Sequence, residues 1–200
     1  MDSDTMFNTG SRQLQRQFDT VKLADRIIEK LAHTKFTSND SEFIQSRSLF
    51  FLSTADSNGH PDCSYKGGDP GFVRVLDATT LAFPSYDGNG MFISLGNIQV
   101  NPNIGLLFID FESPRRLRVN GRATVSLDDE LMSEFHGAQA IVRVVPEVIF
   151  PNCPRYIHQV QTVSKSENIP RKDYVPPQPE WKTRPHFNEV LPDSDPAKQQ

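Results

Sequence analysis

Cysteine is scarce in this sequence of 200 residues, which contains only Cys63 and Cys153. The two lie far apart and neither has a second cysteine nearby, so the sequence excludes a CxxC motif and a small scaffold held together by disulfides. A reducing compartment suits such a chain. Cys153 could act as a thiolate near His158, but a buried and inert cysteine is the more common case.

Long apolar runs are also missing. No stretch approaches the ~18 consecutive apolar residues of a membrane-spanning helix. The first residues, MDSDTMFNTGSRQ, are acidic and polar where a signal peptide would have a basic start and an apolar run. We therefore expect a cytoplasmic protein without a membrane partner.

The chain has no excess of positive charge. It holds 21 Lys and Arg against 25 Asp and Glu, which gives a net charge of -4 at pH 7. Nucleic acids and anionic lipids are bound by clustered Lys and Arg, so neither is an expected partner.

Convincing metal ligands are lacking as well. His60, Asp62 and Cys63 are close in sequence, but Asp62 and Cys63 point to opposite faces of a strand and no fourth ligand is near. For a haem iron, His136 and His158 lie outside the strands that carry the motifs described below. We expect no metal site.

The length and composition favour one folded core with decorated ends. Two hundred residues are within the range that an all-β barrel fills as one domain. The hydrophobic fraction of 36% is low, because the two ends are polar and the C-terminal end is rich in proline. The middle of the chain must therefore supply the core.

The N-terminal part has a helical period. Leu14 and Phe18, and then Leu23, Ile27 and Leu31, recur at spacings of three and four residues. The residue Asp19 or Thr20 could cap the second of these helices. We expect residues 1–40 to form a helical segment that packs on the barrel.

The period changes to that of β-strands after residue 48, with turn residues between short apolar runs. Six or more strands with only one or two helices between them favour a small antiparallel barrel over a βαβ fold. Pro146 indicates an edge strand or a bulge, since proline cannot donate to the ladder. The predicted strands cover residues 49–56, 60–66, 72–77, 79–84, 104–110, 116–126 and 140–150.

The remaining segments complete the predicted organisation. A helix is expected from residue 91 to 98, before Asn101-Pro102, and another after a capping box made by Ser126 and Asp129. Residues 154–161 have a helical pattern, and little regular structure is expected after residue 168. The barrel would then occupy residues 41–163, followed by a Pro-rich extended tail over residues 164–200.

The segment SYKGGDPGFVRVLD can present an anion site. Lys66 offers a point charge, and the glycines that follow it let the main chain approach a ligand closely. The same Gly-Gly-Asp-Pro-Gly run is more often an ordinary loop, so both interpretations stay open.

A second segment, FPSYDGNGMFISLGNIQVNP, leads from a strand through a Gly-rich turn into the start of a helix at Gly90. The first amides of a helix and its dipole attract phosphate, and Ser85 and Asn89 could add donors. Asp87 could instead cap the helix with its carboxylate, which is at least as common.

The third segment is RLRVNGRATVS, in which alternation puts Leu117 and Val119 on one strand face and Arg116 and Arg118 on the other. Two arginines on one face are usually solvated. A guanidinium fork is also a good partner for a flavin phosphate or a pyrimidine carbonyl.

Taken together, these segments resemble the pyridoxamine 5'-phosphate oxidase-like flavin family, in particular a branch of FMN-dependent members without an assigned reaction. The resemblance runs from about Gly10 to Ile157 and includes FFLSTADSNGHPDCSYKGGDPGFVRVLD, LAFPSYDGNGMFISLGNIQVNPNIGLLFIDF and RLRVNGRA. It implies a homodimeric split barrel that holds FMN in two symmetric grooves at the subunit interface and acts on a small-molecule substrate.

The resemblance also implies which residues contact FMN. Lys66 would be an added phosphate cation, and Ser85 takes the place of a threonine next to the phosphate. The Arg-Lys pair that grips the phosphate in the vitamin B6 oxidase is replaced here by Asn89, Gly90 and Met91. The strand whose backbone follows the flavin falls on Phe72, Val73, Arg74 and Val75, and the flavin-facing pair on Arg116 and Arg118.

An FMN-dependent oxidoreductase is the leading hypothesis, with Arg116 or Arg118 stabilising the reduced, anionic flavin. No catalytic side chain is assigned. Trp181 could close over the groove or simply anchor the tail. The alternatives are a flavin carrier or sensor without catalysis, and a barrel that binds haem or a deazaflavin.

Overall fold

A computed structural model describes residues 6–198 of the chain, so residues 1–5 of the predicted N-terminal segment and 199–200 of the predicted tail lie outside the described residues. The chain divides into two compact units, Met1–Thr162 and Val163–Gln200. Among the described residues, no helix has both the length and the apolar character needed to cross a bilayer.

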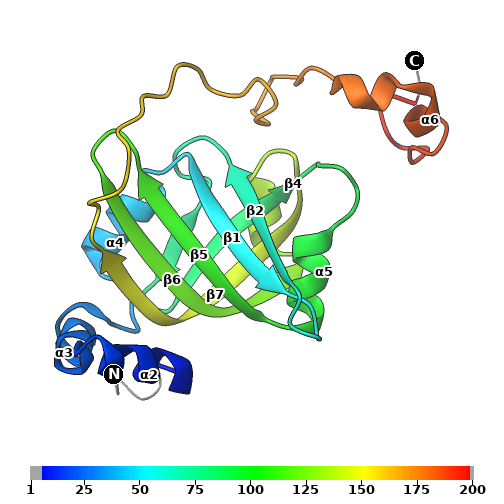
Figure 1. Cartoon of the computed structure of the whole chain (residues 1–200). Helices are drawn as coiled ribbons and strands as arrows, with labels where there is room; N and C mark the ends of the chain where they lie inside the picture. The colour runs from blue at the N-terminus through cyan, green and yellow to red at the C-terminus, as the bar shows by residue number, and fades with distance from the viewer. Residues whose placement is uncertain (1–5, 199–200) are drawn as a thin grey trace. The chain divides into compact units, whose positions relative to one another are not determined.

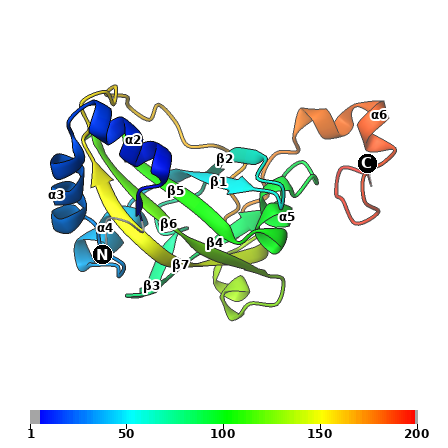
Figure 2. The same ribbon diagram turned by 60° about the horizontal axis from the view of Figure 1, so that its bottom comes forward.

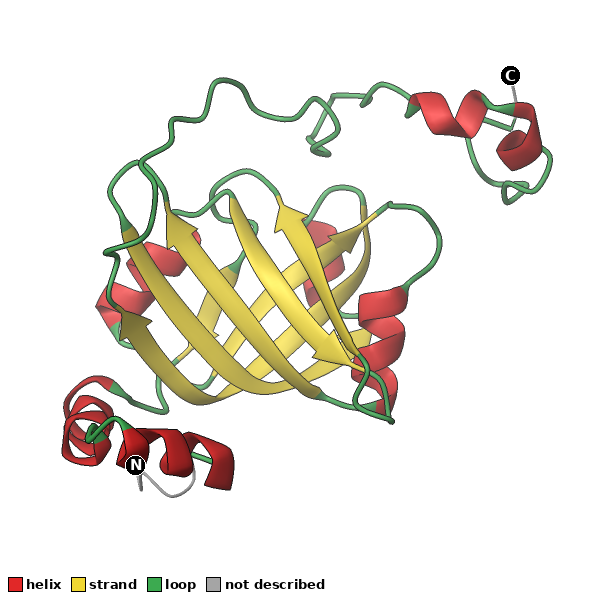
Figure 3. Ribbon diagram, in the orientation of Figure 1, coloured by secondary structure: helices red, strands yellow, loops and turns green. Residues whose placement is uncertain are grey.

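A seven-stranded sheet forms the body of the first unit, and its neighbouring strands are antiparallel. The order is β2-β1-β5-β6-β7-β4-β3, so β2 and β3 stand at the two ends and do not close the sheet. Figures 1 and 3 show it curled into a barrel. The fold is mainly antiparallel β with few helices, consistent with the predicted split barrel. The strands are β1 (Leu49–Ala55), β2 (Pro61–Gly67), β3 (Arg74–Asp77), β4 (Thr80–Tyr86), β5 (Asn103–Asp110), β6 (Arg115–Ser126) and β7 (Ala138–Asn152).

Alternate residues of the strands fill the barrel. In β1, Phe50 and Leu52 are fully buried while Ser53 is exposed, which is the period-2 pattern of a strand with one face in the core. The ring of Phe50 contacts those of Phe72, Phe83 and Phe108 at centroid distances of 5.8, 4.9 and 5.2 Å. Burial of each such side chain stabilises the fold by about 1.5–3 kcal/mol.

Pro146 lies at a bulge and not on an edge strand, since β7 is paired with both β6 and β4. The register between β6 and β7 shifts between Asn120 and Gly121, and Gly121 faces Pro146. A Cβ on Gly121 would lie 2.2 Å from the Val145 carbonyl oxygen, so only glycine fits there. The bulge bends the two long strands and so helps the sheet to curl.

The predicted N-terminal helices are present as α2 (Thr9–Gln17) and α3 (Val21–Leu31). Thr20 is the N-cap residue of α3, but its side chain makes no capping bond, and Asp19 has a φ of 54°. Figure 2 shows α3 beside the barrel, where it contacts β7. His33 then exchanges two backbone hydrogen bonds with Ile149 of β7.

A helix absent from the prediction, α4 (Ser38–Gln45), follows, and the predicted boundary between residues 40 and 41 falls inside it. Thr37 and Asp40 form a capping box, and Phe43 and Ile44 are buried. Eight residues give too few turns for a clear period, so the capping box was the only strong signal.

Two local predictions are wrong. Asp129, not Ser126, is the N-cap of the short 3-10 helix η1 (Glu130–Glu134), where its carboxylate accepts from the Leu131 amide. Residues 154–161 do not form a helix, because Val160 donates to the Phe111 carbonyl and holds the segment along the β5–β6 turn.

The second unit is extended at first and then folds on itself. It holds η2 (Glu180–Thr183) and α6 (Pro185–Asn188), so this part of the tail has regular structure that the sequence did not predict. The buried Lys182 ammonium binds the Asp195 carboxylate at 2.8 Å, and the Asn188 amide donates to the Lys182 and Ala197 carbonyls. Trp181 packs edge-on against Phe187 within this unit.

Candidate functional site

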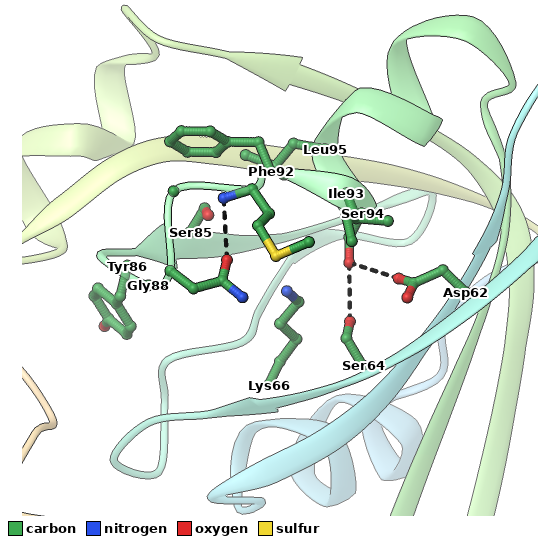
Figure 4. A pocket seen from close by; sticks show the side chains of 13 residues that line it. Asp62, Ser64, Lys66, Ser85, Tyr86, Gly88, Phe92, Ile93, Ser94 and Leu95 are labelled. Carbon is green, nitrogen blue, oxygen red and sulfur yellow. Dashed lines mark hydrogen bonds between the residues drawn. The ribbon is translucent and has the colours of Figure 1, made fainter. Parts of the chain in front are cut away.

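A cavity of about 220 Å³ lies between the terminal strand β2, the end of β4 and the segment that follows β4 (Figure 4). Its floor comes from β2, its far wall from the end of β4, and its roof from the loop that follows and the first turn of α5 (Ile93–Val100). The lining residues are Asp62, Ser64 and Lys66, then Ser85 and Tyr86, then Gly88 to Phe92, and finally Ile93, Ser94 and Leu95.

The β2 side chains converge because they alternate. Asp62, Ser64 and Lys66 share the face of β2 that looks into the cavity, while Cys63 and Tyr65 are exposed on the other face. As the terminal strand of the sheet, β2 pairs only with β1 in the described sheet. On its inner face, β2 contacts α5.

Lys66 is the cation of this cavity. The side chain is half-buried, and the ammonium makes no hydrogen bond or ion pair with any residue between 6 and 198. Burial lowers the pKa of Lys66, and the negative charge of Asp62 partly offsets that shift. An anion in the cavity would find this ammonium available.

Three side chains form a hydrogen-bonded chain beside Lys66. The buried Ser94 hydroxyl donates to Oδ2 of Asp62 at 3.1 Å and lies 3.0 Å from the Ser64 hydroxyl. A hydroxyl has one proton, so Ser94 must accept from Ser64. The two dashed lines in Figure 4 follow this chain from β2 to α5 and back.

The start of α5 points its amides toward the cavity. The first intrahelical bond runs from the Gly96 amide to the Phe92 carbonyl, so the amides of Ile93, Ser94 and Leu95 have no partner within the helix. The N-cap residue is Phe92, in the left-handed conformation at φ 49° and without a capping side chain. The helix therefore begins at Ile93, three residues after the predicted start at Gly90, because Phe92 has a left-handed conformation that is not helical.

The loop before α5 carries Asn89 and Asp87. The Asn89 side chain accepts from the Met91 amide, while Asp87 accepts from the Gln139 side chain. The suggestion that Asp87 caps the helix is wrong, because the N-cap residue is Phe92 and no side-chain capping bond is present.

Tyr86 adds a hydroxyl at the far wall. Burial raises its pKa, Asp69 raises it further, and Arg74 opposes the shift. The phenol is therefore neutral at physiological pH and can donate a hydrogen bond to an anion.

The structure brings together Lys66, Ser85, Asn89, Gly90 and Met91 among the residues predicted to bind the cofactor. The predicted flavin-backbone strand lies elsewhere. Phe72 and Val73 are buried in the core, with Val75 packed against it. Arg74 forms an ion pair with Glu134 and lies over the Phe135 ring.

Arg116 and Arg118 lie on the outer face of β6, opposite the buried Leu117 and Val119. Nη2 of Arg116 donates to the Cys153 carbonyl at 2.8 Å, and its Nε is buried with no hydrogen-bond partner among the described residues. Arg118 stacks over Phe150. Within one chain, these arginines do not line the cavity.

Sequence analysis missed four polar residues of the cavity: Asp62, Ser64, Tyr86 and Ser94. The alternation in PDCSYK would have placed the first two on the side of Lys66. Which side faces a cavity depends on β2 being the last strand of the sheet, which no local pattern reveals.

Comparison with known proteins identifies the family. The family model described as pyridoxamine 5'-phosphate oxidase matches residues 36–164. The chain belongs to this family. A search of curated protein sequences finds no match.

The chain is also similar to several solved structures. A candidate pyridoxamine 5'-phosphate oxidase of Lactobacillus delbrueckii is 24% identical, with a TM-score of 0.48 over 59% of this chain and 95% of that one. HupZ of Group A Streptococcus is 19% identical, with a TM-score of 0.48 over 63% and 99%. HutZ, the heme storage protein of Vibrio cholerae, is 22% identical, with a TM-score of 0.42 over 55% and 90%.

Proposed function

We propose that the chain binds FMN with the phosphate in the cavity and works as an FMN-dependent oxidoreductase on a small-molecule substrate. The observation that carries this proposal is the Lys66 ammonium, which is half-buried at the cavity and has no acceptor among the described residues. A desolvated cation without a partner is costly, and an anionic ligand offsets that cost.

The other cavity groups fit a phosphate. The amides of Ile93, Ser94 and Leu95 are the unsatisfied donors of a helix start, which is a favourable position for a phosphate. Tyr86 adds a neutral hydroxyl, and a Cβ on Gly90 would meet no atom within 4 Å, so a ligand can approach the loop closely.

The cavity is smaller than the ~300–1,000 Å³ of pockets that enclose a whole cofactor. It can take the phosphate end, and the rest of FMN would extend past its mouth. Met91, Phe92 and Ile93 are exposed there by 64%, 55% and 46%, which gives an apolar surface for the flavin or a second chain to cover.

The flavin role proposed for the arginines requires a homodimer. Arg116 and Arg118 lie on the outer face of β6, so they can reach the same flavin only if they come from a second copy. FMN, when bound, supplies the electron-accepting chemistry. The guanidinium groups would then stabilise negative charge on the reduced ring.

A haem is a poorer fit than a flavin at this site. No histidine is among the described residues that line the cavity, so an axial ligand for the iron is missing there. Nor do three His, Cys, Asp or Glu side chains between residues 6 and 198 come together as a metal site.

The test is reconstitution of the purified protein with FMN, followed by titration of flavin fluorescence. We expect binding by the wild type and a loss of at least about tenfold in Lys66→Met, since a hydrogen bond to a charged group is worth about 1.5–3 kcal/mol. Lys35→Met, at an exposed lysine away from the cavity, is the matched control. Protein that stays colourless and runs as a monomer would contradict the proposal.

Catalysis needs a separate measurement. Anaerobic mixing of the FMN-loaded protein with NADH or NADPH should reduce the flavin if the protein is an enzyme. A flavin that binds tightly but stays oxidised with these donors and with a generic acceptor would favour a carrier or sensor.

A further inference from the structure

Asp62 gives the cavity a negative charge where an anion site should have none. Its carboxylate lies on the same face of β2 as Lys66, and the two side chains influence each other electrostatically without forming an ion pair. The two formal charges cancel, so the cavity does not select a ligand by net charge alone.

The carboxylate has room for one more donor. Oδ2 of Asp62 accepts from Ser94, and Oδ1 has no hydrogen-bond donor among the residues that the structure describes. A ligand that fills the cavity would displace water from this oxygen, and a carboxylate oxygen then left without a donor costs about 1–3 kcal/mol or more. A ligand that brings its own proton removes that cost.

The serine hydroxyls cannot supply protons to the ligand in this arrangement. The Ser94 hydroxyl donates its one hydrogen bond to Asp62, and the Ser64 hydroxyl donates to Ser94. At this end of the cavity, Asp62 and Ser64 can therefore only accept further hydrogen bonds. The donors are at the other end, on Lys66 and the first turn of α5.

We infer that Asp62 makes the cavity selective for a phosphate group that carries a proton or takes one up on binding, as a phosphate monoester with a second pKa of about 6 can, and against an anion that cannot, such as sulfate. The P–OH group would donate to Oδ1 of Asp62, while the other phosphate oxygens accept from Lys66 and the α5 amides. Sulfate has the same size and shape but no proton to offer, so it would meet the carboxylate as a bare like charge. The inference rests on the proposed phosphate site and adds its specificity-determining residue.

The experiment is a calorimetric titration of the full-length protein, free of flavin, with inorganic phosphate and with sulfate at pH 7. We expect the wild type to bind phosphate at least about tenfold more tightly than sulfate. In Asp62→Asn the side chain can still accept from Ser94, so the fold is kept, and its amide can donate to either anion. The preference should fall to within about threefold, chiefly through tighter sulfate binding.

Asp128→Asn, at an exposed carboxylate bonded to Ser126, is the control and should keep the wild-type preference. Equal binding of both anions by the wild type, or an unchanged preference in Asp62→Asn, would overturn the inference. FMN titrations of the same variants separate the two proposals. If FMN binds while the anion preference is absent, only the role of Asp62 fails; if neither FMN nor phosphate binds, the phosphate site itself fails.

Discussion

The Ser94 hydroxyl on α5 donates to the Asp62 carboxylate on β2 at 3.1 Å, beside the cavity. With the hydrogen bond between Ser64 and Ser94, it joins the start of the helix to the terminal strand on the cavity side. The side chain of Asn97 makes a similar link, from α5 to the Thr54 hydroxyl of β1. These bonds hold α5 against β2 and β1.

Replacing Ser94 by Ala should lower the free energy of unfolding by about 1–2 kcal/mol, because a buried hydrogen bond to a charged group is lost. Ser133→Ala is a matched control, since that exposed hydroxyl donates only to the Glu130 carbonyl nearby. Urea denaturation measures both. An equal effect of the two substitutions would show that Ser94 does not stabilise the contact between α5 and β2.

Lys66 should make stability depend on alkaline pH. Its pKa in the folded chain lies below the ordinary value of 10.5, so the unfolded chain binds more protons between the two values and stability rises with pH in that window. Lys66→Met removes the buried charge. We expect this variant to unfold at higher urea than the flavin-free wild type at pH 7, and the difference to shrink toward pH 10.5. A stability difference between the variant and the wild type that grows with pH would contradict this prediction.

Asp40 should stabilise the fold at neutral pH. Burial raises its pKa, but hydrogen bonds from Thr37 and His33 outweigh burial and hold the pKa below the usual 3.8. A lowered pKa contributes stability that is present above 3.8 and lost as the pH falls through the folded value. Asp40→Asn should therefore cost about 1–3 kcal/mol at pH 7 and much less near pH 3. Denaturant titrations across this range test the trend.

Gly121→Ala should be strongly destabilising, by about 1–3 kcal/mol or more, because its Cβ would meet the Val145 carbonyl at the bulge. Gly96→Ala is the control, since a Cβ at that helical position meets nothing within 4 Å. It should stabilise α5 by about 0.5–1 kcal/mol. Thermal unfolding of both variants would show opposite shifts, and a shift in the same direction would contradict the packing argument.

The strands of the barrel could be predicted because their apolar runs are short and separated by turn residues. Each predicted strand is present, with ends within two residues of the predicted ones. Pro146 pointed to a bulge for a physical reason, the missing amide, and the bulge is there. The helix α4 was missed because Phe43 and Ile44 alone do not make a helical period.

The cavity could be predicted only in part. Lys66 and the Gly-rich loop carry local signals that the sequence displays. Asp62 and Ser94 are hydrogen-bonded to each other although they lie 32 residues apart in the sequence, and only the fold brings them together. The sequence also could not show that the Arg116 face and the cavity lie on opposite sides of the sheet, because that depends on how the sheet curls.

β2 and β4 are not hydrogen-bonded to each other, and the cavity uses both as walls. A ligand that contacts β2, β4 and α5 at once would therefore link parts of the barrel that are not hydrogen-bonded to each other. Binding would raise the free energy of unfolding by about 2.7 kcal/mol at a free ligand concentration one hundred times its Kd. Without such a ligand, the protein would lack this contribution to its free energy of unfolding and would be more susceptible to proteolysis.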